Sequence, residues 1–398
     1  MFASLLRKFR RRRAPTPPEA WGTGAGPVRD PLCGVDDLLG RPTVNLATPE
    51  LQRFIAGQVV LVSGAGGSIG SEICRQAMRF LPRRLVLLDR AENALFEIDQ
   101  ELRHRWVGAD LAACVADITD RPRVQGILAR ERPTLLFHCA AHKHVPMMEA
   151  NPGEAVKNNV LGTRTLAESA LAAGVEAFVM VSTDKAVNPT SVMGATKRCA
   201  ELIAQSLNGE GKTRFVAVRF GNVLASSGSV VPIFRRQIAA GGPVTVTHPD
   251  MRRYFMTIPE AAQLVMQAGA IGKGGEIFVL DMGQPIRILD LAREMIRRAG
   301  LVPDRDIGIV FTGIRPGEKL YEELAGADER TRPTSHPKIR VWELPRSTRR
   351  QAQEMASMLE SVVDADRTAV VETLMRVVPE YAPDGLRTGS PLRLAPAA

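Results

Sequence analysis

The sequence predicts an α/β protein with a doubly wound parallel sheet and a smaller substrate-binding lobe. Short apolar runs have the length and composition of buried strands, and they lie at residues 59–62, 84–89, 134–140, 177–182 and 215–220. Longer amphipathic stretches with helical spacing separate them, for example at 71–80, 154–173 and 191–207. Because buried strands that alternate with helices form right-handed βαβ units, we expect a parallel sheet. After about residue 221 the alternation becomes irregular, which indicates the lobe.

Composition excludes several classes of protein. The chain has 398 residues, of which 45% are apolar, so it can bury a core and is not generally disordered. No apolar run approaches the roughly 18 residues that a membrane span needs. The five cysteines are scattered and form no Cys-x-x-Cys pair, which argues against a disulfide framework and favours a cytoplasmic location. Aromatic residues make up only 5%, and no basic–aromatic stripe indicates nucleic-acid binding.

The net charge of +9 is concentrated in the first 13 residues. This segment, MFASLLRKFRRRR, holds six basic residues and no acidic one, and leaves 46 basic against 43 acidic residues elsewhere. We interpret it as a disordered, solubilising extension. The alternative is peripheral contact of residues 1–13 with the inner membrane surface, through their cations and apolar side chains. The following stretch, up to residue 50, is rich in proline and glycine and is typical of a linker.

A glycine-rich turn follows the first predicted strand. The sequence VSGAGGSIGSEI places Gly64, Gly67 and Gly70 between that strand and the next helix. Glycine permits a tight turn and a close approach of the backbone to a pyrophosphate, and the helix start offers free N–H groups. Asp89 ends the second strand 19 residues after Gly70, where its carboxylate can accept ribose hydroxyls. We therefore predict a Rossmann domain that prefers NAD to NADP, although the adjacent Arg90 leaves NADP open.

The rest of the chain is divided by the same reasoning. Residues 347–378 are predicted to form two helices, with Ser347 and Asp366 as N-caps and a stripe of methionines as core. The expected organisation is a tail and linker at 1–50, an NAD-binding Rossmann domain at 51–225, mainly a substrate lobe at 226–345, and C-terminal helices and tail at 346–398.

Three of the six histidines lie close together after the fourth predicted strand. In FHCAAHKHVPMME, His138, His142 and His144 follow one another with no carboxylate or thiol placed to complete a zinc site. We therefore expect no metal ion here. The loop is better interpreted as a wall beside the cofactor and the substrate, with Lys143 or His144 facing the substrate.

The segment VSTDKAVNPTSVMGATKR, at 181–198, indicates the reaction class. Alcohol-oxidising short-chain dehydrogenases place a Ser or Thr at a strand end and a Tyr-x-x-x-Lys pair on the next helix, where both side chains share a face. Thr183 and Lys197 occupy two of these positions, but position 193 is methionine and the three tyrosines lie far away. Either the activity is lost, or another group takes the alcohol proton.

The neighbouring acid and amine in this segment suggest proton transfer. Asp184 could protonate a leaving hydroxyl group, while Lys185, whose pKa burial is expected to lower, removes a C–H proton next to a carbonyl. The alternative interpretation is a surface ion pair.

Six motifs in order resemble one known family: STDKAVNPTSVMGATKR, AAHKHVPMMEANP, NNVLGT, VRFGNVLASSGSVVPIF, RRYFMTIPEA and RPGEKLYEEL. Together they resemble the CapD-type polysaccharide-biosynthesis branch of the extended short-chain dehydrogenase/reductase superfamily, whose members include UDP-N-acetylglucosamine 4,6-dehydratases. The resemblance runs from about residue 36 to about 330. Larger relatives carry a membrane-spanning half ahead of this region, so the chain is similar to the soluble short form.

The resemblance implies a lyase that acts on a UDP-N-acetylhexosamine. It would be a configuration-retaining UDP-N-acetylglucosamine 4,6-dehydratase that makes a 4-keto-6-deoxy sugar for surface glycans, with NAD as transient hydride acceptor. In the branch that it resembles, methionine replaces the tyrosine base, and the base for the C4 hydroxyl stays open between Lys197 and a water linked to Thr183. The alternatives are a UDP-sugar 4-epimerase and a non-catalytic NAD-binding regulator.

The motifs and the resemblance give three sets of expected site residues in a homo-oligomeric enzyme. The catalytic set is Thr183, Asp184, Lys185, Met193 and Lys197. The cofactor set is Gly64, Gly67, Ser68, Ile69, Gly70, Asp89, Asp117, Ile118, Ala140 and Lys197. The substrate set is Lys143, His144, Asn222, Arg253, Arg315 and Glu318, in which the arginines can neutralise a diphosphate.

Overall fold

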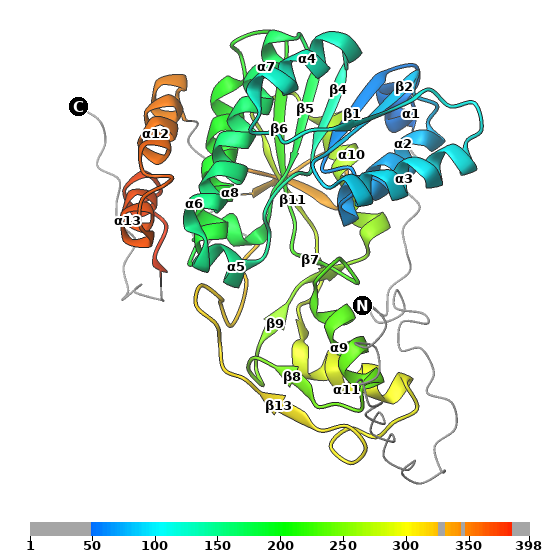
Figure 1. The fold of residues 1–398 in the computed structure, drawn as a ribbon, viewed down its shortest axis with the longest axis vertical. Coiled ribbons are helices and arrows are strands. Elements are labelled where there is room, and N and C mark those ends of the chain that lie inside the picture. Colours follow the sequence, from blue (N-terminus) through cyan, green and yellow to red (C-terminus); the bar gives the residue numbers. More distant parts are fainter. Residues whose placement is uncertain (1–48, 325–330, 344–346, 384–398) are drawn as a thin grey trace, which may run out of the picture.

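A nine-stranded sheet forms the centre of the protein (Figure 1). The computed structural model describes residues 49–324, 331–343 and 347–383, so the basic tail of residues 1–13 and nearly all of the expected linker lie outside the described residues. Seven strands are parallel, in the order β3 (Leu111–Val115), β2 (Arg84–Asp89), β1 (Val59–Ser63), β4 (Leu135–His138), β5 (Ala177–Val181), β6 (Arg214–Arg219) and β11 (Ile277–Leu280). Two antiparallel strands complete the sheet, β15 (Ile339–Trp342) and β14 (Thr331–Pro333).

The sheet is buried on both faces, which confirms the doubly wound prediction. Along β1, Val59 and Leu61 belong to one hydrophobic core, whereas Val60 and Val62 belong to the other. Helices on the first face include α4 (Arg121–Glu131), α7 (Thr163–Ala172) and α8 (Val192–Leu207). Those on the second face are α1 (Pro49–Ile55), α2 (Ser68–Arg79), α3 (Glu92–Arg105) and α10 (Ile258–Ile271). All five apolar runs of the sequence become strands of this sheet.

Two predicted helices differ from the structure in their extent. The helix expected at 71–80 begins at Ser68, because Gly67 already takes the extended N-cap conformation. The single helix expected at 154–173 consists of α6 (Pro152–Ala155), a π-helical segment η2 (Val156–Gly162) and α7. A short helix α5 (Val145–Ala150) precedes them. The π-helical segment adds a bulge next to the cavity, as such bulges often do at functional sites.

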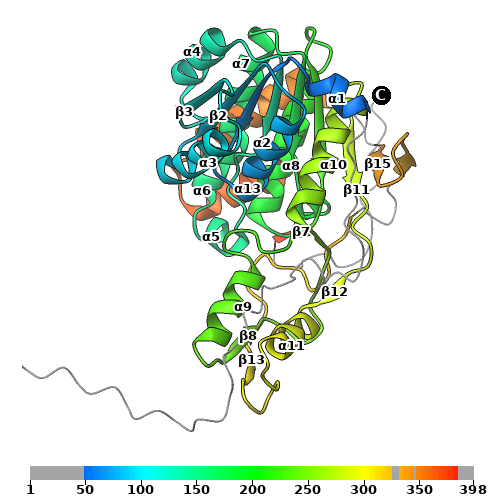
Figure 2. The ribbon, with the colours of Figure 1, turned by 90° about the vertical axis from the view of Figure 1, so that its right-hand side faces the viewer.

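A smaller lobe lies at the carboxyl edge of the sheet, as Figure 2 shows below the strands. It contains α9 (Val230–Ala239), β8 (Val244–Val246), β9 (Arg252–Arg253), β12 (Ile286–Arg287), α11 (Ile288–Arg298) and β13 (Ile309–Phe311), packed around their own hydrophobic core. Two short paired strands, β7 (Asn222–Val223) and β10 (Phe255–Met256), lie between the lobe and the sheet. Within the expected lobe range, α10, β11, β14 and β15 return to the main sheet layer.

Two C-terminal helices, α12 (Arg349–Ser361) and α13 (Arg367–Val377), cover the α8 side of the sheet (Figure 1). Asp366 caps α13 as predicted, and Met355 packs into the core. The predicted N-cap Ser347 is wrong, because α12 is capped by Thr348. The Thr348 side chain accepts a hydrogen bond from the N–H of Gln351, whose side chain bonds back to the Thr348 N–H in a capping box.

Candidate active site

The glycine turn between β1 and α2 is tight and closely packed. Gly64 has φ +71°, and a Cβ there would lie 2.6 Å from the backbone nitrogen of Ala140. A side chain on Gly70 would collide with the carbonyl oxygen of Gly64. Glycine is therefore required at both positions, as the sequence predicts.

The start of α2 and the end of β2 complete a cradle for a dinucleotide. The first turn of α2 offers the N–H groups of Ser68, Ile69 and Gly70, which have no carbonyl of their own helix to bond. The Asp89 carboxylate accepts hydrogen bonds from the N–H groups of Gly66 and Ala91, both at 2.9 Å. Asp89 thus holds the glycine loop, and its remaining lone pairs can accept hydroxyl groups.

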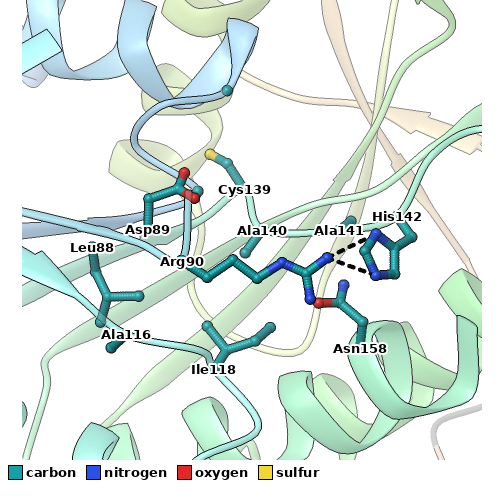
Figure 3. A pocket seen from close by; sticks show the side chains of 12 residues that line it. Leu88, Asp89, Arg90, Ala116, Ile118, Cys139, Ala140, Ala141, His142 and Asn158 are labelled. Atoms are coloured by element: carbon teal, nitrogen blue, oxygen red, sulfur yellow. Dashed lines mark hydrogen bonds between the residues drawn. The ribbon is translucent and has the colours of Figure 1, made fainter. Parts of the chain in front are cut away.

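A cavity of about 150 Å³ lies beside this turn (Figure 3). Its walls include Gly64, Gly67, Asp89, Ile118 and Ala140, all of them expected cofactor residues. Asp117 does not line the cavity, because its carboxylate accepts hydrogen bonds from the backbone N–H and the hydroxyl of Thr119.

Arg90 crosses this cavity from the end of β2 (Figure 3). Its guanidinium donates to Nε2 of His142 at 2.9 Å and to the carboxylate of Asp117 at 3.4 Å. The arginine is thereby bonded to His142, which lines the cavity, and to Asp117, which does not.

A larger cavity of about 650 Å³ shares one wall with the smaller one and extends into the lobe. The shared wall contains Gly64, Gly67, Cys139, Ala141 and His142. Many of the expected site residues line the larger cavity: Ser68, Ile69, Gly70, Lys143, His144, Thr183, Lys185, Met193, Lys197, Asn222, Arg253, Arg315 and Glu318. The sequence motifs therefore meet at one cavity, at the carboxyl edge of the sheet where doubly wound proteins bind ligands.

The Thr183–Asp184–Lys185 triplet lies where β5 ends, in the short 3₁₀ helix η3 (Asp184–Ala186) and its N-cap. Asp184 is 1% exposed and lies behind the wall rather than in it. Its Oδ1 accepts hydrogen bonds from the Thr183 hydroxyl at 2.9 Å and from Lys185 Nζ at 3.0 Å. The Lys185 ammonium also donates to Oδ1 of Asn222 at 3.2 Å. Asp184 is buried and the Lys185 side chain is only 18% exposed, so the two form a hydrogen-bonded pair at the cavity and not a surface ion pair.

One residue of this cluster was missed by the sequence analysis. Glu322 is 7% exposed, lines the cavity, and places Oε1 at 3.6 Å from Lys185 Nζ. Burial alone would lower the pKa of Lys185, but Asp184 and Glu322 outweigh burial and hold that pKa above its usual value. The expectation that burial lowers the pKa of Lys185 is therefore wrong. The available signal was the position of Glu322 in RPGEKLYEEL.

Met193 and Lys197 share one face of α8, one turn apart, and both line the larger cavity. The helix is capped by the Ser191 hydroxyl, and the N–H of Val192 donates to Oε1 of Glu149 at 2.7 Å. Arg367 of α13 in turn donates to Oε2 of Glu149 at 3.1 Å.

Lys197 differs sharply from Lys185 in its surroundings. Its ammonium donates to the carbonyl oxygen of Val181 at 2.8 Å, and burial lowers its pKa to about 8. Lys197 thus has a depressed pKa, in contrast to Lys185.

The three clustered histidines do not converge. His138 is buried between the hydroxyl groups of Ser63 and Thr163, at 2.8 and 2.9 Å, and burial lowers its pKa to about 3. His142 is fixed by Asn159, which accepts from its N–H and donates to its carbonyl oxygen. Within the described ranges, no three His, Cys, Asp or Glu side chains are grouped as metal ligands.

The expected substrate residues differ in how much of each side chain is already bonded. Lys143 donates to the hydroxyl of Ser226 at 3.3 Å, and Arg315 pairs with Glu318 on the exposed rim. Arg253 is buried and donates to the backbone carbonyl oxygens of residues 252, 319 and 320. It fastens the chain after β13 to β9 while it lines the cavity.

Comparison with known proteins identifies the family. The sequence profile of a family described as "Polysaccharide biosynthesis protein" matches residues 60–343. The chain belongs to this polysaccharide biosynthesis protein family. The matched range contains every residue of the two cavities, from the glycine turn to Glu322.

Curated relatives of this polysaccharide biosynthesis protein have different names. The chain is 56% identical to the capsular polysaccharide biosynthesis protein CapD of Staphylococcus aureus, over 74% of this chain and 49% of CapD. The chain therefore spans about half the length of that relative. It is 31% identical both to an inverting UDP-N-acetylglucosamine 4,6-dehydratase of Campylobacter jejuni (69% and 79% of the two chains) and to a UDP-glucose 4-epimerase of Rickettsia massiliae (68% and 79%).

Solved structures share the fold of this family member. Pen from Bacillus thuringiensis is 35% identical with a TM-score of 0.68, over 74% of this chain and 92% of Pen. The DesIV dTDP-glucose 4,6-dehydratase of Streptomyces venezuelae, solved with NAD, is 23% identical with a TM-score of 0.58, over 67% and 88% of the two chains. In the part of the chain that the structure describes, no helix is long and apolar enough to cross a membrane.

Proposed function

We propose that the protein is a nucleotide-sugar 4,6-dehydratase, a lyase that removes water from UDP-N-acetylglucosamine. The observation that carries the proposal is the buried Asp184–Lys185 pair in a cavity that continues from the dinucleotide cradle into the lobe. At about 650 Å³, this cavity has the size of small-molecule sites. The dehydratase relative and the capsular polysaccharide relative support the substrate class and a role in surface-glycan synthesis. A cytoplasmic location stays a prediction.

The glycine turn and the smaller cavity beside it supply the groups that would hold the adenosine and pyrophosphate of NAD, and the nicotinamide would extend into the larger cavity. Gly64 and Gly70 leave room for a pyrophosphate, the start of α2 supplies N–H donors, and Asp89 can accept the ribose hydroxyls. Bound there, NAD would take up hydride from C4 of the sugar and give it back at C6. NADP would place its 2′-phosphate against the negative charge of Asp89, and Arg90, which could neutralise that phosphate, is already bonded to His142 and Asp117. Nucleotide extracted from the purified protein should be NAD; mainly NADP would contradict this assignment.

The elimination step uses the Asp184–Lys185 pair as acid and base. The Lys185 ammonium passes a proton along its 3.0 Å hydrogen bond to Asp184, which leaves a neutral amine beside a carboxylic acid. The amine takes the C5 proton, a C5–C6 double bond forms, and the C6–O bond breaks as the proton of Asp184 passes to the departing hydroxyl through the Thr183 hydroxyl, which lines the cavity and bonds Asp184 at 2.9 Å. The pair returns to its ionised state, so protons balance over the step.

The alternative activity is 4-epimerisation, which needs the redox step at C4 and no elimination. Sequence identity does not separate the two, because the dehydratase and the epimerase relatives are both 31% identical to this chain. Met193 in place of a tyrosine base and the buried Asp184–Lys185 pair favour the dehydratase. A non-catalytic regulator would not need that pair.

Retention of configuration at C5 is the finer proposal. Lys185 lies on one side of the reacting sugar, and a thioether at Met193 has no proton to donate. A proton that leaves to Lys185 and comes back from it returns to the same face. The proton NMR coupling constants at H5 of fresh product should therefore show the D-xylo sugar, and an L-arabino pattern would contradict the proposal.

The decisive experiment is incubation of the purified protein with UDP-N-acetylglucosamine, followed by mass spectrometry. A dehydratase gives a product lighter by one water. An epimerase gives a product of unchanged mass but a new sugar configuration, and a regulator returns the substrate unaltered. Homo-oligomer formation and membrane contact through residues 1–13 stay predictions, to be measured by light scattering and vesicle sedimentation.

A further inference from the structure

The chain segment 315–324, here called the return segment, lies across the loop that joins η3 to α8. Lys319 Nζ donates to the carbonyl oxygen of Val187 at 3.0 Å, and the Thr190 hydroxyl donates to the carbonyl oxygen of Gly317 at 3.2 Å. Asn188 donates to the Glu323 carboxylate at 3.0 Å. These contacts join two parts of the chain that are more than 100 residues apart, and they fix the return segment over the catalytic triplet.

This placement carries Glu322 into the cavity opposite Asp184. The Glu322 side chain is 2% exposed, with Oε1 at 3.6 Å from Lys185 Nζ and at 3.7 Å from Arg253 Nη2. Its Oε2 is buried and has no hydrogen-bond partner among the described residues. An ionised oxygen without a partner is costly in a protein interior, so a carboxylate there needs a reason beyond packing.

Four groups face the Lys185 ammonium. Asp184 of its own 3₁₀ helix and Glu322 of the return segment carry negative charge, and Arg253 of β9 carries positive charge. Asn222 of β7 adds a neutral oxygen. Because Arg253 is tied to three backbone carbonyl oxygens, it cannot move to Glu322 without releasing them. Glu322 therefore lies between two cations, the fixed Arg253 at 3.7 Å and Lys185 at 3.6 Å.

We propose that Glu322 is a positioning residue for the elimination, whose carboxylate holds the Lys185 ammonium in the cavity and determines the pH range in which Lys185 works as a base. The proposal rests on the proposed dehydratase function. Between two carboxylates, Lys185 stays protonated until it hands its proton to Asp184, so acid and base are created together and only when the pair reacts. Glu322 itself gains and loses no proton in this step.

Chemical labelling of Lys185 tests the charge effect without any turnover. Only the neutral amine of a lysine reacts with acetic anhydride, so the labelling rate at a fixed pH near 8.5 reports the neutral fraction. The Glu322→Gln variant keeps the side-chain shape and removes the charge at 3.6 Å. A carboxylate so close shifts a partner pKa by about 1–3 units, so labelling of Lys185 should rise about tenfold or more in the variant. Peptide mass spectrometry measures it, with exposed Lys212 as internal standard.

The matched control is Glu323→Gln, the same substitution one residue along the return segment. Glu323 is half exposed and bonds Lys319 and Asn188 rather than Lys185. Labelling of Lys185 should be unchanged in this variant. Equal labelling of Lys185 in wild type and Glu322→Gln, or an equal increase in both variants, would overturn the proposal.

The pH dependence of water elimination gives the second readout. In Glu322→Gln, the part of the kcat–pH profile that follows the titration of Lys185 (its Lys185 limb) should move to lower pH by about 1–3 units. KM for the UDP-sugar should change little. Glu322→Asp, which keeps the charge, should restore the limb with a lower kcat. A reduced kcat with an unmoved limb shows a merely structural role. Failure of the proposed function is distinguishable, because a wild type that makes no dehydrated product still reports the Lys185 charge through labelling.

Discussion

At the scale of single residues, the buried Asp184–Lys185 pair is the feature on which the proposed chemistry depends. We expect Asp184→Asn and Lys185→Ala each to reduce water elimination by about 10²–10⁴-fold, because each removes a positioned acid or base. Bound dinucleotide should stay at the wild-type level, since neither residue lines the smaller cavity. Turnover is followed by mass spectrometry and bound nucleotide by its absorbance after extraction.

A surface carboxylate provides the control for these variants. Asp364 is exposed and paired with Lys157, and neither residue lines a cavity, so Asp364→Asn should leave turnover unchanged. Near-full turnover in a folded Asp184→Asn or Lys185→Ala protein would mean that the residue has another role.

Lys197 should give the reaction a pH dependence near 8. Burial lowers its pKa to about 8, so its neutral form is scarce below that pH and predominant above it. If Lys197 takes the C4 hydroxyl proton, kcat/KM rises as the pH increases through about 8 and then levels. Lys197→Arg keeps the positive charge and cannot lose the proton, so this limb should disappear.

The control here is Lys212→Arg, at an exposed lysine outside the cavities. This variant should keep the wild-type profile. A limb near pH 8 that persists in Lys197→Arg would assign the C4 proton to the water linked to Thr183.

At the scale of elements, the start of α12 shows how neighbouring polar residues compete for one cap. Thr348→Ala removes the hydroxyl that accepts the N–H of Gln351, whereas the backbone N–H of residue 348 can still donate to the Gln351 side chain. The loss of this cap should lower the free energy of unfolding by about 1 kcal/mol. Ser347→Ala is the matched control, because among the described residues the Ser347 hydroxyl bonds only the Thr348 carbonyl oxygen, at 3.4 Å. Urea unfolding measures both, and equal effects would contradict the assigned cap.

Local patterns predicted most of the sheet layer, and the exceptions have physical causes. The five long apolar runs became strands because both of their faces are buried. β3 was not singled out because it lies at one edge of the parallel set and is buried only at Leu111 and Cys114, so it forms no continuous apolar run. Thr348 carries a signal that was present in the sequence, a Gln three residues later, which Ser347 lacks.

The site was predictable wherever its residues lie close together in sequence. Spacing alone places Gly64, Gly70 and Asp89 at one cradle, and Met193 and Lys197 on one helix face. Glu322 meets Lys185 only because the chain returns from the lobe, a contact that no local pattern encodes. The direction of the Lys185 pKa shift depends on that contact, and so it could not be derived beforehand.

At the scale of the whole molecule, the lobe is connected to the sheet by several crossings of the chain. Among the described residues, the chain passes from the sheet to the lobe after β6 and after β11, and from the lobe back to the sheet after β10. We expect these crossings to restrict movement of the lobe, so that closure around a ligand consists of small displacements. We expect the radius of gyration from X-ray scattering to be the same with and without UDP and NAD. A clear decrease on addition of ligand would indicate hinge closure instead.

The link from Arg367 through Glu149 to the start of α8 has a consequence for synthesis on the ribosome. Domains fold from the N-terminus as the chain emerges, yet Arg367 belongs to the last helix that the structure describes. Until α13 has emerged, the carboxylate that bonds Val192 lacks its arginine, and the outer side of α8 lacks its cover. The contacts that hold α8, the helix with Met193 and Lys197, are therefore completed late in translation. A nascent chain spends most of its synthesis time with an incomplete active site.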